Sequence, residues 1–165
     1  MSNHLQQHLD AIDIALVRML QQQGRLTNAD LAERVGLSPS ACLRRVQRLE
    51  QDGVLAGYRA NVDPRAIGLG LEAFIGVKLV HKDQKAIDQF VNQVAQWEEV
   101  VACYILTGEM DFMLHLVTVD LDAYSDFVVG RLLTAPAMAS VNSNIVLRTV
   151  KANAGLPTGH LSKAS

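Results

Sequence analysis

The sequence predicts an α+β protein in which a small helical domain precedes a ferredoxin-like βαββαβ domain. Apolar residues recur at the spacing of amphipathic helices up to Leu55, whereas from Leu71 onward strand-like segments alternate with helical ones. Between them, Asp63-Pro64, Gly68 and Gly70 mark a turn-rich connection. We therefore expect domains over residues 9–62 and 72–151, a linker over 63–71, and an irregular tail over 152–165.

The composition suits a protein with packed cores. The 165 residues are 49% hydrophobic, and 15 basic side chains stand against 17 acidic ones, which leaves a net charge of −2. These values exclude a disordered, highly charged tail protein. No apolar run approaches the roughly 18 residues that a membrane span needs, and the N-terminus lacks the pattern of a secretory signal. We therefore expect a cytoplasmic protein with no membrane partner.

The near-neutral net charge hides an uneven distribution. Residues 1–68 contain eight arginines and seven acidic residues, a balance of +1, whereas residues 69–165 contain seven basic and ten acidic residues, a balance of −3. No acidic residue lies between Glu33 and Glu50, and this stretch contains four of the arginines. A nucleic-acid-binding face is therefore compatible with the overall composition.

Two helices are predicted in the first 36 residues. Apolar residues at three- and four-residue spacing indicate an amphipathic helix over about residues 9–22, which Gly24 ends. Thr27 is placed to cap the next helix, and Asp30, three residues later, forms a variant of the capping box. Gly36 then ends this second helix.

The third predicted helix begins directly after a short turn. Ser38 is its expected N-cap, Pro39 its first residue, and Gly53 closes it. Its apolar side includes Cys42, which we expect in the core. Only about three residues, Gly36-Leu37-Ser38, separate it from the second helix, and such a pair of short helices is typical of a helix-turn-helix.

The third helix is predicted to present a basic side away from the core. A projection at about 100° per residue places Arg44 and Arg48 opposite the apolar residues, with Arg45 beside them. Arginine binds guanine bidentately or meets phosphates, and small neighbours permit close approach to a major groove. A merely solvated helix face is the alternative, but the tight turn and its cap favour DNA. The candidate DNA-binding residues are Thr27, Asn28, Ser38, Ser40, Ala41, Arg44, Arg45 and Arg48.

Residues 54–62 are predicted to form a strand that belongs to a wing or to a connecting arm. Tyr58 in this segment is compatible with a contact to a DNA phosphate and equally with a packing role.

The second part of the chain is predicted to fold as the ferredoxin-like split unit. Asp83 and Asp120 are placed to cap two helices, the second of which ends at Ala135-Pro136. Because both helices are expected on one face of the sheet, the other face needs a partner, and we expect an oligomer. The four predicted strands span residues 72–80, 100–107, 112–119 and 140–151.

The sequence predicts no enzyme, metal site or cofactor. The five histidines are dispersed, no spacing of cysteine and histidine is typical of zinc, and no glycine-rich loop suits a phosphate. The best small-molecule candidate is the hairpin connection from Thr107 to Asp111. Gly108 allows a ligand to approach main-chain N–H groups that suit a carboxylate, and Asp111 or Glu109 is able to hold an ammonium group. On these residues alone, an ordinary turn is the simpler interpretation.

Two motifs, in this order, resemble a known family. The stretch Asp10-Ala-Ile-Asp-Ile-Ala-Leu and the segment from Gly24 to Gly53 resemble the leucine-responsive regulatory protein (Lrp)/AsnC family of bacterial transcription regulators. In the second part, Gly108-Glu-Met-Asp111 matches the G-x-x-D signature of that family. The resemblance covers about residues 8–151.

The resemblance implies a winged helix-turn-helix domain followed by a ferredoxin-like domain that binds an amino-acid effector between subunits. It implies double-stranded DNA, a small amino acid such as leucine or methionine, and further copies of the chain as partners, in a dimer or an octamer. The effector-binding residues that it implies by position are Tyr104, Leu106, Thr107, Gly108, Glu109, Met110, Asp111 and Met138.

Two other functions fit part of this pattern. Some decarboxylases of the siroheme-dependent haem pathway resemble the same family in architecture, so a tetrapyrrole enzyme is one alternative. An amino-acid sensor that does not bind DNA is the other. The arginine side of the third helix disfavours both alternatives, and the dispersed histidines also disfavour the enzyme.

Overall fold

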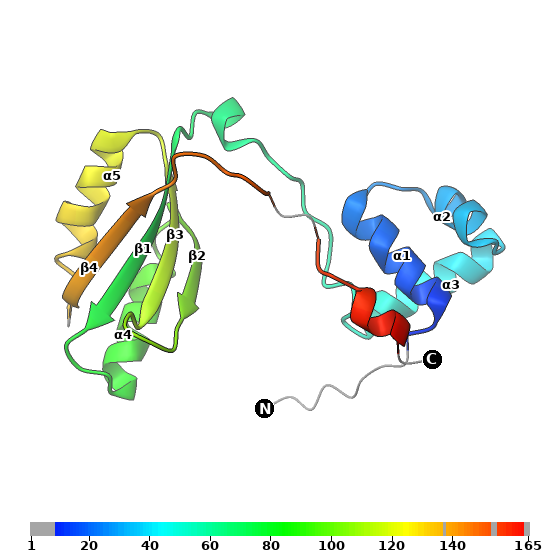
Figure 1. The fold of residues 1–165 in the computed structure, drawn as a ribbon, viewed down its shortest axis with the longest axis horizontal. Helices are drawn as coiled ribbons and strands as arrows, with labels where there is room; N and C mark the ends of the chain where they lie inside the picture. The colour runs from blue at the N-terminus through cyan, green and yellow to red at the C-terminus, as the bar shows by residue number, and fades with distance from the viewer. Residues whose placement is uncertain (1–8, 137, 153–154, 164–165) are drawn as a thin grey trace. The chain divides into compact units, whose positions relative to one another are not determined.

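The computed structural model describes residues 9–136, 138–152 and 155–163, and the chain divides into two units. One unit contains the chain up to Asn61 together with the described residues from Lys151 onward. The other unit is Val62–Val150. Each unit has its own hydrophobic core and is described by itself (Figure 1).

The first unit contains the three predicted helices, α1 (Ala11–Gln22), α2 (Asn28–Val35) and α3 (Pro39–Gln51). The predicted capping box is confirmed, because Thr27 accepts from the Asp30 main chain while the Asp30 side chain accepts in return. Ser38 caps α3 as predicted, with Pro39 in its first turn. A second capping box, formed by Asp10 and Asp13 at the start of α1, was not identified from the sequence.

The core of this unit joins all three helices. Leu16 and Leu20 of α1, Leu31 of α2, and Cys42 and Leu49 of α3 form one buried cluster. Cys42 is fully buried, which confirms its predicted core position. Burial of this cluster fixes how α3 lies on α1 and α2.

The predicted strand over residues 54–62 is wrong. The chain instead turns at Gly53, where φ is +72°, and the Leu55 N–H donates to the Leu49 carbonyl at 3.0 Å. No other strand is present in the described part of this unit, so a strand here would have no neighbour to pair with. The Tyr58 hydroxyl donates to Glu50 Oε1 at 3.0 Å, a local packing contact.

The second unit has the predicted βαββαβ order. Its four strands lie side by side in the order β2-β3-β1-β4, and every neighbouring pair is antiparallel (Figure 1). A 3₁₀-helix (Pro64–Ile67) precedes the first strand. The elements are β1 (Leu71–Leu79), α4 (Gln84–Val94), β2 (Val100–Ile105), β3 (Phe112–Thr118), α5 (Leu121–Phe127), a π-helix (Val128–Leu132) and β4 (Met138–Ile145).

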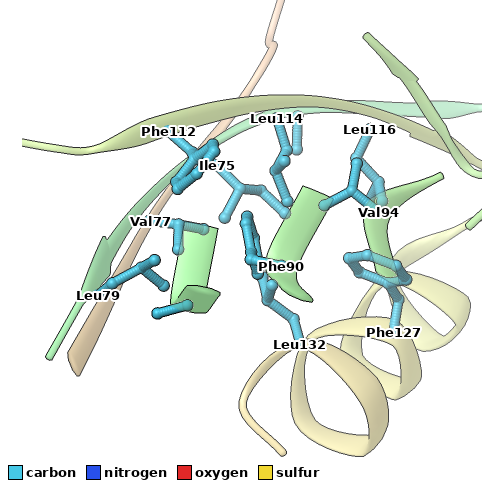
Figure 2. Packing of buried hydrophobic residues seen from close by; sticks show 12 residues of the cluster. Ile75, Val77, Leu79, Phe90, Val94, Phe112, Leu114, Leu116, Phe127 and Leu132 are labelled. Atoms are coloured by element: carbon cyan, nitrogen blue, oxygen red, sulfur yellow. The ribbon is translucent and has the colours of Figure 1, made fainter. Parts of the chain in front are cut away.

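Both helices of this unit cover the same face of the sheet, as predicted. Phe90 of α4 points toward Ile75 of β1 and Leu114 of β3, and Phe127 of α5 points toward Leu116 of β3 (Figure 2). Trp97 lies edge-on to both Phe90 and Phe127, with ring centroids 6.2 and 5.2 Å away. The core therefore lies between the sheet and one helical layer, and no helix of the described unit covers the other sheet face.

The π-helix after α5 places a second apolar residue in this core. Phe127 and Leu132 are five positions apart, and both are fully buried. The Leu133 N–H donates to the Val128 carbonyl at 2.9 Å, which is the wider hydrogen bond of a π turn. Arg131 consequently faces outward, where it pairs with Glu99.

The last strand is shorter than predicted. We expected a strand over residues 140–151, whereas β4 ends at Ile145. Ile145 pairs with Ala73, and the next hydrogen bond, from the Val146 N–H to the Glu72 carbonyl at 2.8 Å, reaches the beginning of β1. Residues 147–151 have no strand of the described sheet to pair with, although their composition favours one.

We predicted an irregular tail over residues 152–165, of which 153–154 and 164–165 lie outside the described residues; residues 155–163 are more ordered than predicted. The Leu156 N–H donates to Gln21 Oε1 at 2.5 Å, and Arg18 Nε donates to Thr158 Oγ1 at 2.6 Å. A 3₁₀-helix over Gly159–Lys163 follows. The described tail therefore packs on α1, where Gln21 bonds its main chain and Arg18 bonds a side-chain hydroxyl.

Candidate functional site

Three of the predicted DNA-binding residues stabilise the turn between α2 and α3. Asn28 Nδ2 donates to the Pro39 carbonyl at 2.6 Å and so ties the start of α2 to the start of α3. The Ser38 hydroxyl accepts from the Ala41 N–H and lies 3.3 Å from the Ser40 hydroxyl. Thr27, Asn28 and Ser38 therefore fix the helix-turn-helix geometry.

The side of α3 that faces away from the core is formed by Ser40, Arg44 and Gln47, all of which are exposed. Ala41 is half-buried at its margin. Arg44 has no ion pair with any residue that the structure describes. Gln47 was missed from the sequence, although it lies one turn after Arg44 and two turns after Ser40. Arginine and glutamine both suit base edges in a major groove.

Arg45 and Arg48 are ion-paired, in contrast to the free basic cluster that the acid-free stretch of sequence suggested. Arg45 Nη1 lies 2.7 Å from Asp10 Oδ2 and 2.8 Å from Asp13 Oδ1. Arg48 Nη2 lies 2.6 Å from Asp13 Oδ2. Both acids belong to the first turns of α1, more than 30 residues away in sequence. Tertiary packing brings these acids to a helix whose own sequence neighbours are not acidic.

The acids and arginines favour each other's charged forms. The pKa of Asp10 lies below its ordinary value, chiefly because the Asp13 N–H donates to it and also because Arg45 lies beside it. The pKa of Arg45 is raised by its hydrogen bonds to Asp10 and then to Asp13. These two shifts favour the charged forms of Asp10 and Arg45.

The second candidate site is the loop between β2 and β3. Gly108 has φ +130°, a backbone conformation that other residues rarely adopt, and no atom lies near the position of a side chain there. Leu106, Thr107 and Glu109 are exposed. The main-chain N–H groups of residues 107–110 donate to no acceptor within the described residues. The loop thus offers open hydrogen-bond donors at its tip.

Asp111 anchors this loop to the end of β1. Its Oδ2 accepts the Leu79 N–H at 2.9 Å, its Oδ1 lies 2.6 Å from Lys82 Nζ, and its own N–H donates to the Val77 carbonyl at 2.9 Å. Lys82, and next the Leu79 N–H, hold the pKa of Asp111 below its ordinary value. The carboxylate predicted to hold an ammonium group therefore already holds one, that of Lys82, which the sequence did not indicate.

The face of the sheet opposite the helices carries several of the predicted effector residues; we call it the open sheet face. Tyr104 pairs with Met113, which pairs with Gly76, so these three residues share that face. A Cβ at Gly76 would lie 3.0 Å from Met110 Cγ, which places the Met110 side chain over β1. Phe74 is 37% exposed on the same face.

His115 continues the open sheet face beyond these residues. Its ring stacks on Phe74 with centroids 4.6 Å apart, and its Nε2 lies 2.7 Å from Glu72 Oε1. Aromatic and polar side chains thus lie together on a surface that no helix of the described unit covers.

Met138 lies at the same end of the sheet as the loop. It pairs with Leu79, whose N–H binds Asp111. Met138 packs against the core on the helix side of the sheet, whereas Met110 lies over Gly76 on the open sheet face. These two predicted effector residues therefore lie near the same end of the sheet but on opposite faces. A hollow of about 400 Å³ lies elsewhere, at the Leu71–Thr118 end of the sheet, lined by linker residues 63–65 and 69–72 and by residues 146–149.

Other kinds of site receive no support from the described residues. No group of three or more histidine, cysteine, aspartate or glutamate side chains among them is placed to hold a metal ion. None of the helices in the described part of the chain has the length and apolar character needed to cross a membrane.

Comparison with known families matches both units. A family sequence model described as the Lrp/AsnC ligand binding domain matches residues 72–156, and one described as winged helix-turn-helix DNA-binding matches residues 9–56. The leucine-responsive regulatory protein of Rhizobium meliloti is 41% identical over 143 residues, which cover 87% of this chain and 92% of that protein. The Bkd operon transcriptional regulator of Pseudomonas aeruginosa is 34% identical, with 90% and 97% covered.

Solved structures agree with these matches. A transcriptional regulator of Neisseria meningitidis, determined in complex with L-methionine, superposes with a TM-score of 0.89 at 42% identity over 93% of this chain and 99% of that chain. An AsnC family transcriptional regulator of Agrobacterium tumefaciens superposes with a TM-score of 0.86 at 30% identity over 92% and 99% of the two chains. These similarities confirm the predicted fold class.

Proposed function

Because the chain belongs to the Lrp/AsnC family of transcription regulators, with a DNA-binding helix-turn-helix and an amino-acid ligand-binding domain, we propose that it reads DNA with α3 and responds to L-methionine bound at the β2–β3 loop. The observation that supports DNA reading is the exposed side of α3, which is formed by Ser40, Arg44 and Gln47. The N-terminus of this helix is capped by Ser38. The methionine part is supported by the relative solved with that ligand, which is 42% identical.

Within this proposal, Arg44 reads a base and its neighbours position the helix. Among the three arginines of α3, Arg44 is the one without an ion pair to any described residue, and bidentate pairing with guanine suits it. Ser40 and Ala41 let the backbone of α3 approach the groove. A guanidinium has five N–H donors, and the ion pairs of Arg45 and Arg48 do not use all of them. Arg45 and Arg48 contact phosphates with their remaining N–H groups. Thr27, Asn28 and Ser38, at the starts of α2 and α3, lie where helix N-termini favour phosphate.

The effector is proposed to bind at the loop with both of its charged groups satisfied. Its carboxylate accepts from the open main-chain N–H groups around Gly108. Its ammonium group replaces Lys82 Nζ on Asp111 Oδ1, while Oδ2 keeps the Leu79 N–H. Lys82 is exchangeable because its side chain is 57% exposed and loses little on returning to water. Leu106, Thr107 and Glu109 line the loop, and Tyr104 and Met110 supply the neighbouring surface of the open sheet face. Met138 packs against the core on the other face and is left out of the proposed site.

A second copy of the chain is proposed to cover the open sheet face. Phe74, Tyr104 and Met113 on this face are apolar side chains that an isolated unit leaves in contact with water. A dimer formed there, and an octamer built from such dimers, would complete the effector site from a neighbouring subunit. Size-exclusion chromatography with light scattering tests this part, and a monomer at micromolar concentration contradicts it.

Calorimetric titration with amino acids tests the effector site. We expect L-methionine to bind more tightly than L-leucine, and D-methionine not to bind. In the Lys82→Gln variant the affinity for L-methionine rises several-fold, because the competing ammonium is gone, whereas Asp111→Asn loses binding. Lys85→Gln, an exposed lysine of α4, is the matched control and leaves the affinity unchanged. Weaker binding by Lys82→Gln would show that Lys82 holds the ligand instead.

DNA binding by α3 is tested with duplexes selected from a random pool by the unaltered protein. Replacing Arg44 with alanine is expected to cost about 1–3 kcal/mol on the selected duplex and to relax the preference at one base position. Binding that weakens equally on every duplex, with no change in base preference, removes Arg44 from base reading.

A further inference from the structure

We propose that Asp13, assisted by Asp10, is a positioning residue for DNA reading: it holds Arg45 and Arg48 on α3 and restrains their sequence-independent attraction to phosphates. This inference rests on the proposed reading of DNA by α3. It assigns to the start of α1 a role in how selectively the third helix binds.

The geometry of the Asp13 carboxylate carries the proposal. Each of its two oxygens meets a different arginine, Oδ1 at 2.8 Å from Arg45 and Oδ2 at 2.6 Å from Arg48. The Asp13 side chain is only 1% exposed, whereas the side chains of Arg45 and Arg48 are 28% and 51% exposed. The buried Asp13 carboxylate therefore forms ion pairs with two partly exposed guanidiniums and sets their orientation.

The anion itself is rigidly placed. The Asp10 N–H donates to Asp13 Oδ2 at 3.3 Å, and the Asp13 N–H donates to Asp10 Oδ1 at 2.9 Å, so the two acids form the capping box of α1. The same Asp10 carboxylate meets Arg45 at 2.7 Å through its second oxygen. The two acids of the capping box that begins α1 therefore also form the ion pairs with Arg45 and Arg48 of α3.

The carboxylates of Asp10 and Asp13 reduce the net positive charge around α3. Four arginines lie between Glu33 and Glu50, and two carboxylates contact two of them, which leaves a local balance of +2 instead of +4. Attraction to phosphate does not depend on base sequence, whereas contacts to base edges do. Restraining Arg45 and Arg48 thus lowers binding to any DNA and leaves selectivity to Arg44 and its exposed neighbours.

The experiment compares the salt dependence of DNA binding in the unaltered full-length protein and in Asp13→Asn. Two duplexes are used, the one selected from the random pool and a scrambled duplex of the same composition. Asp13→Asn keeps the shape of the side chain, removes the ion pair of Arg48 and leaves Arg45 paired with Asp10 alone. We expect its plot of log affinity against log salt to steepen by about one to two units per DNA-binding domain on both duplexes. The ratio of selected to scrambled affinity falls.

Glu33→Gln is the matched control, because it removes one negative charge from an exposed position on α2 of the same unit without freeing an arginine. Its salt slope is expected to stay unchanged. If Asp13→Asn does not fold, Asp10→Asn replaces an acid whose side chain is 51% exposed and gives a smaller steepening. An unchanged slope in the folded Asp variants, or an equal change in Glu33→Gln, overturns the inference. Failure of the unaltered protein to bind any duplex overturns the proposed function instead.

Discussion

Asp13 and Asp111 serve the two candidate sites in different ways. Asp13 is 1% exposed and meets two arginines of another helix, so both of its oxygens are held by side chains. Asp111 is 16% exposed, with one oxygen on the Leu79 N–H and the other on Lys82, an exposed lysine. The first carboxylate joins two rigid helices, whereas the second joins a loop to the end of a strand.

This difference separates a fixed ion pair from an exchangeable one. A buried carboxylate that lost its cations would be an unpaired charge without solvating water, which is strongly unfavourable. The arginines that pair with Asp13 therefore stay in place. An ion pair to an exposed lysine is worth little, and a ligand with its own ammonium group is able to replace that lysine. Helix α3 is thus held firmly on α1, while the β2–β3 loop keeps one contact that the proposed effector can take over. Three predictions test this contrast.

The largest effect is expected when Asp13 loses both cations. The Arg45→Ala/Arg48→Ala double variant leaves a buried, unpaired carboxylate and is expected to lower the free energy of unfolding of the first unit by about 3–5 kcal/mol. Denaturant unfolding followed by far-UV circular dichroism measures this loss. Fluorescence of Trp97, the single tryptophan, which lies in the second unit, serves as an internal control and keeps its midpoint.

Adding Asp13→Asn to that double variant tests the cause of the loss. Removing the unpaired negative charge of Asp13 is expected to restore part of the lost stability, so the triple variant unfolds at a higher denaturant concentration than the double variant. A triple variant no more stable than the double one would mean that packing of the arginine stems, and not the buried charge, accounts for the loss.

A smaller effect is expected at Asp111. Asp111→Ala leaves the Leu79 N–H without its acceptor and is expected to cost the second unit about 1–3 kcal/mol, whereas Asp111→Asn costs less. The pKa of Asp111 lies below its ordinary value of 3.8, so its stabilisation is present above that pH and is lost as the pH falls through the lowered pKa. The stability gap between the unaltered protein and Asp111→Asn should therefore close below about pH 4. Trp97 fluorescence at several pH values measures it, and a gap that persists in acid contradicts the assignment.

The smallest effect is expected where the tail meets α1. Gln21→Ala removes the side chain that accepts from the Leu156 N–H and donates to the Leu156 carbonyl. Because the site is exposed, the expected loss in the first unit is at most about 1 kcal/mol. Gln22→Ala, an exposed neighbour in the same helix, is the control. Equal midpoints for the two variants would show that the tail adds nothing to stability.

Local signals were sufficient for most of the first unit. Thr27, Gly36 and Ser38 act on main-chain groups within a few residues of themselves, so their roles could be predicted from neighbouring sequence. The capping box of Asp10 and Asp13 carried the same kind of signal, an acid three residues from another, and could have been found. Its contacts with the arginines of α3 could not, because they depend on how two helices pack.

The errors have one physical origin. Residues 54–62 and 146–151 have the composition of strands, but a strand also needs a neighbour with free hydrogen-bonding groups. For residues 54–62 no strand is present in the described part of that unit, and β4 ends where β1 begins. Whether such a neighbour exists is decided by the arrangement of other elements and leaves no trace in the segment itself.

The sequence by itself determined the three helices of the first unit with their helix-turn-helix, the βαββαβ order of the second unit and the position of the β2–β3 loop, because caps, turns and apolar spacing act locally. Only the tertiary structure decided which charges remain free. It brought the acids of α1 to Arg45 and Arg48, and Lys82 to Asp111, leaving Arg44 exposed on α3. Coulomb attraction acts across space between residues far apart in the chain, so a basic stretch of sequence becomes a basic surface only where packing brings no acid beside it.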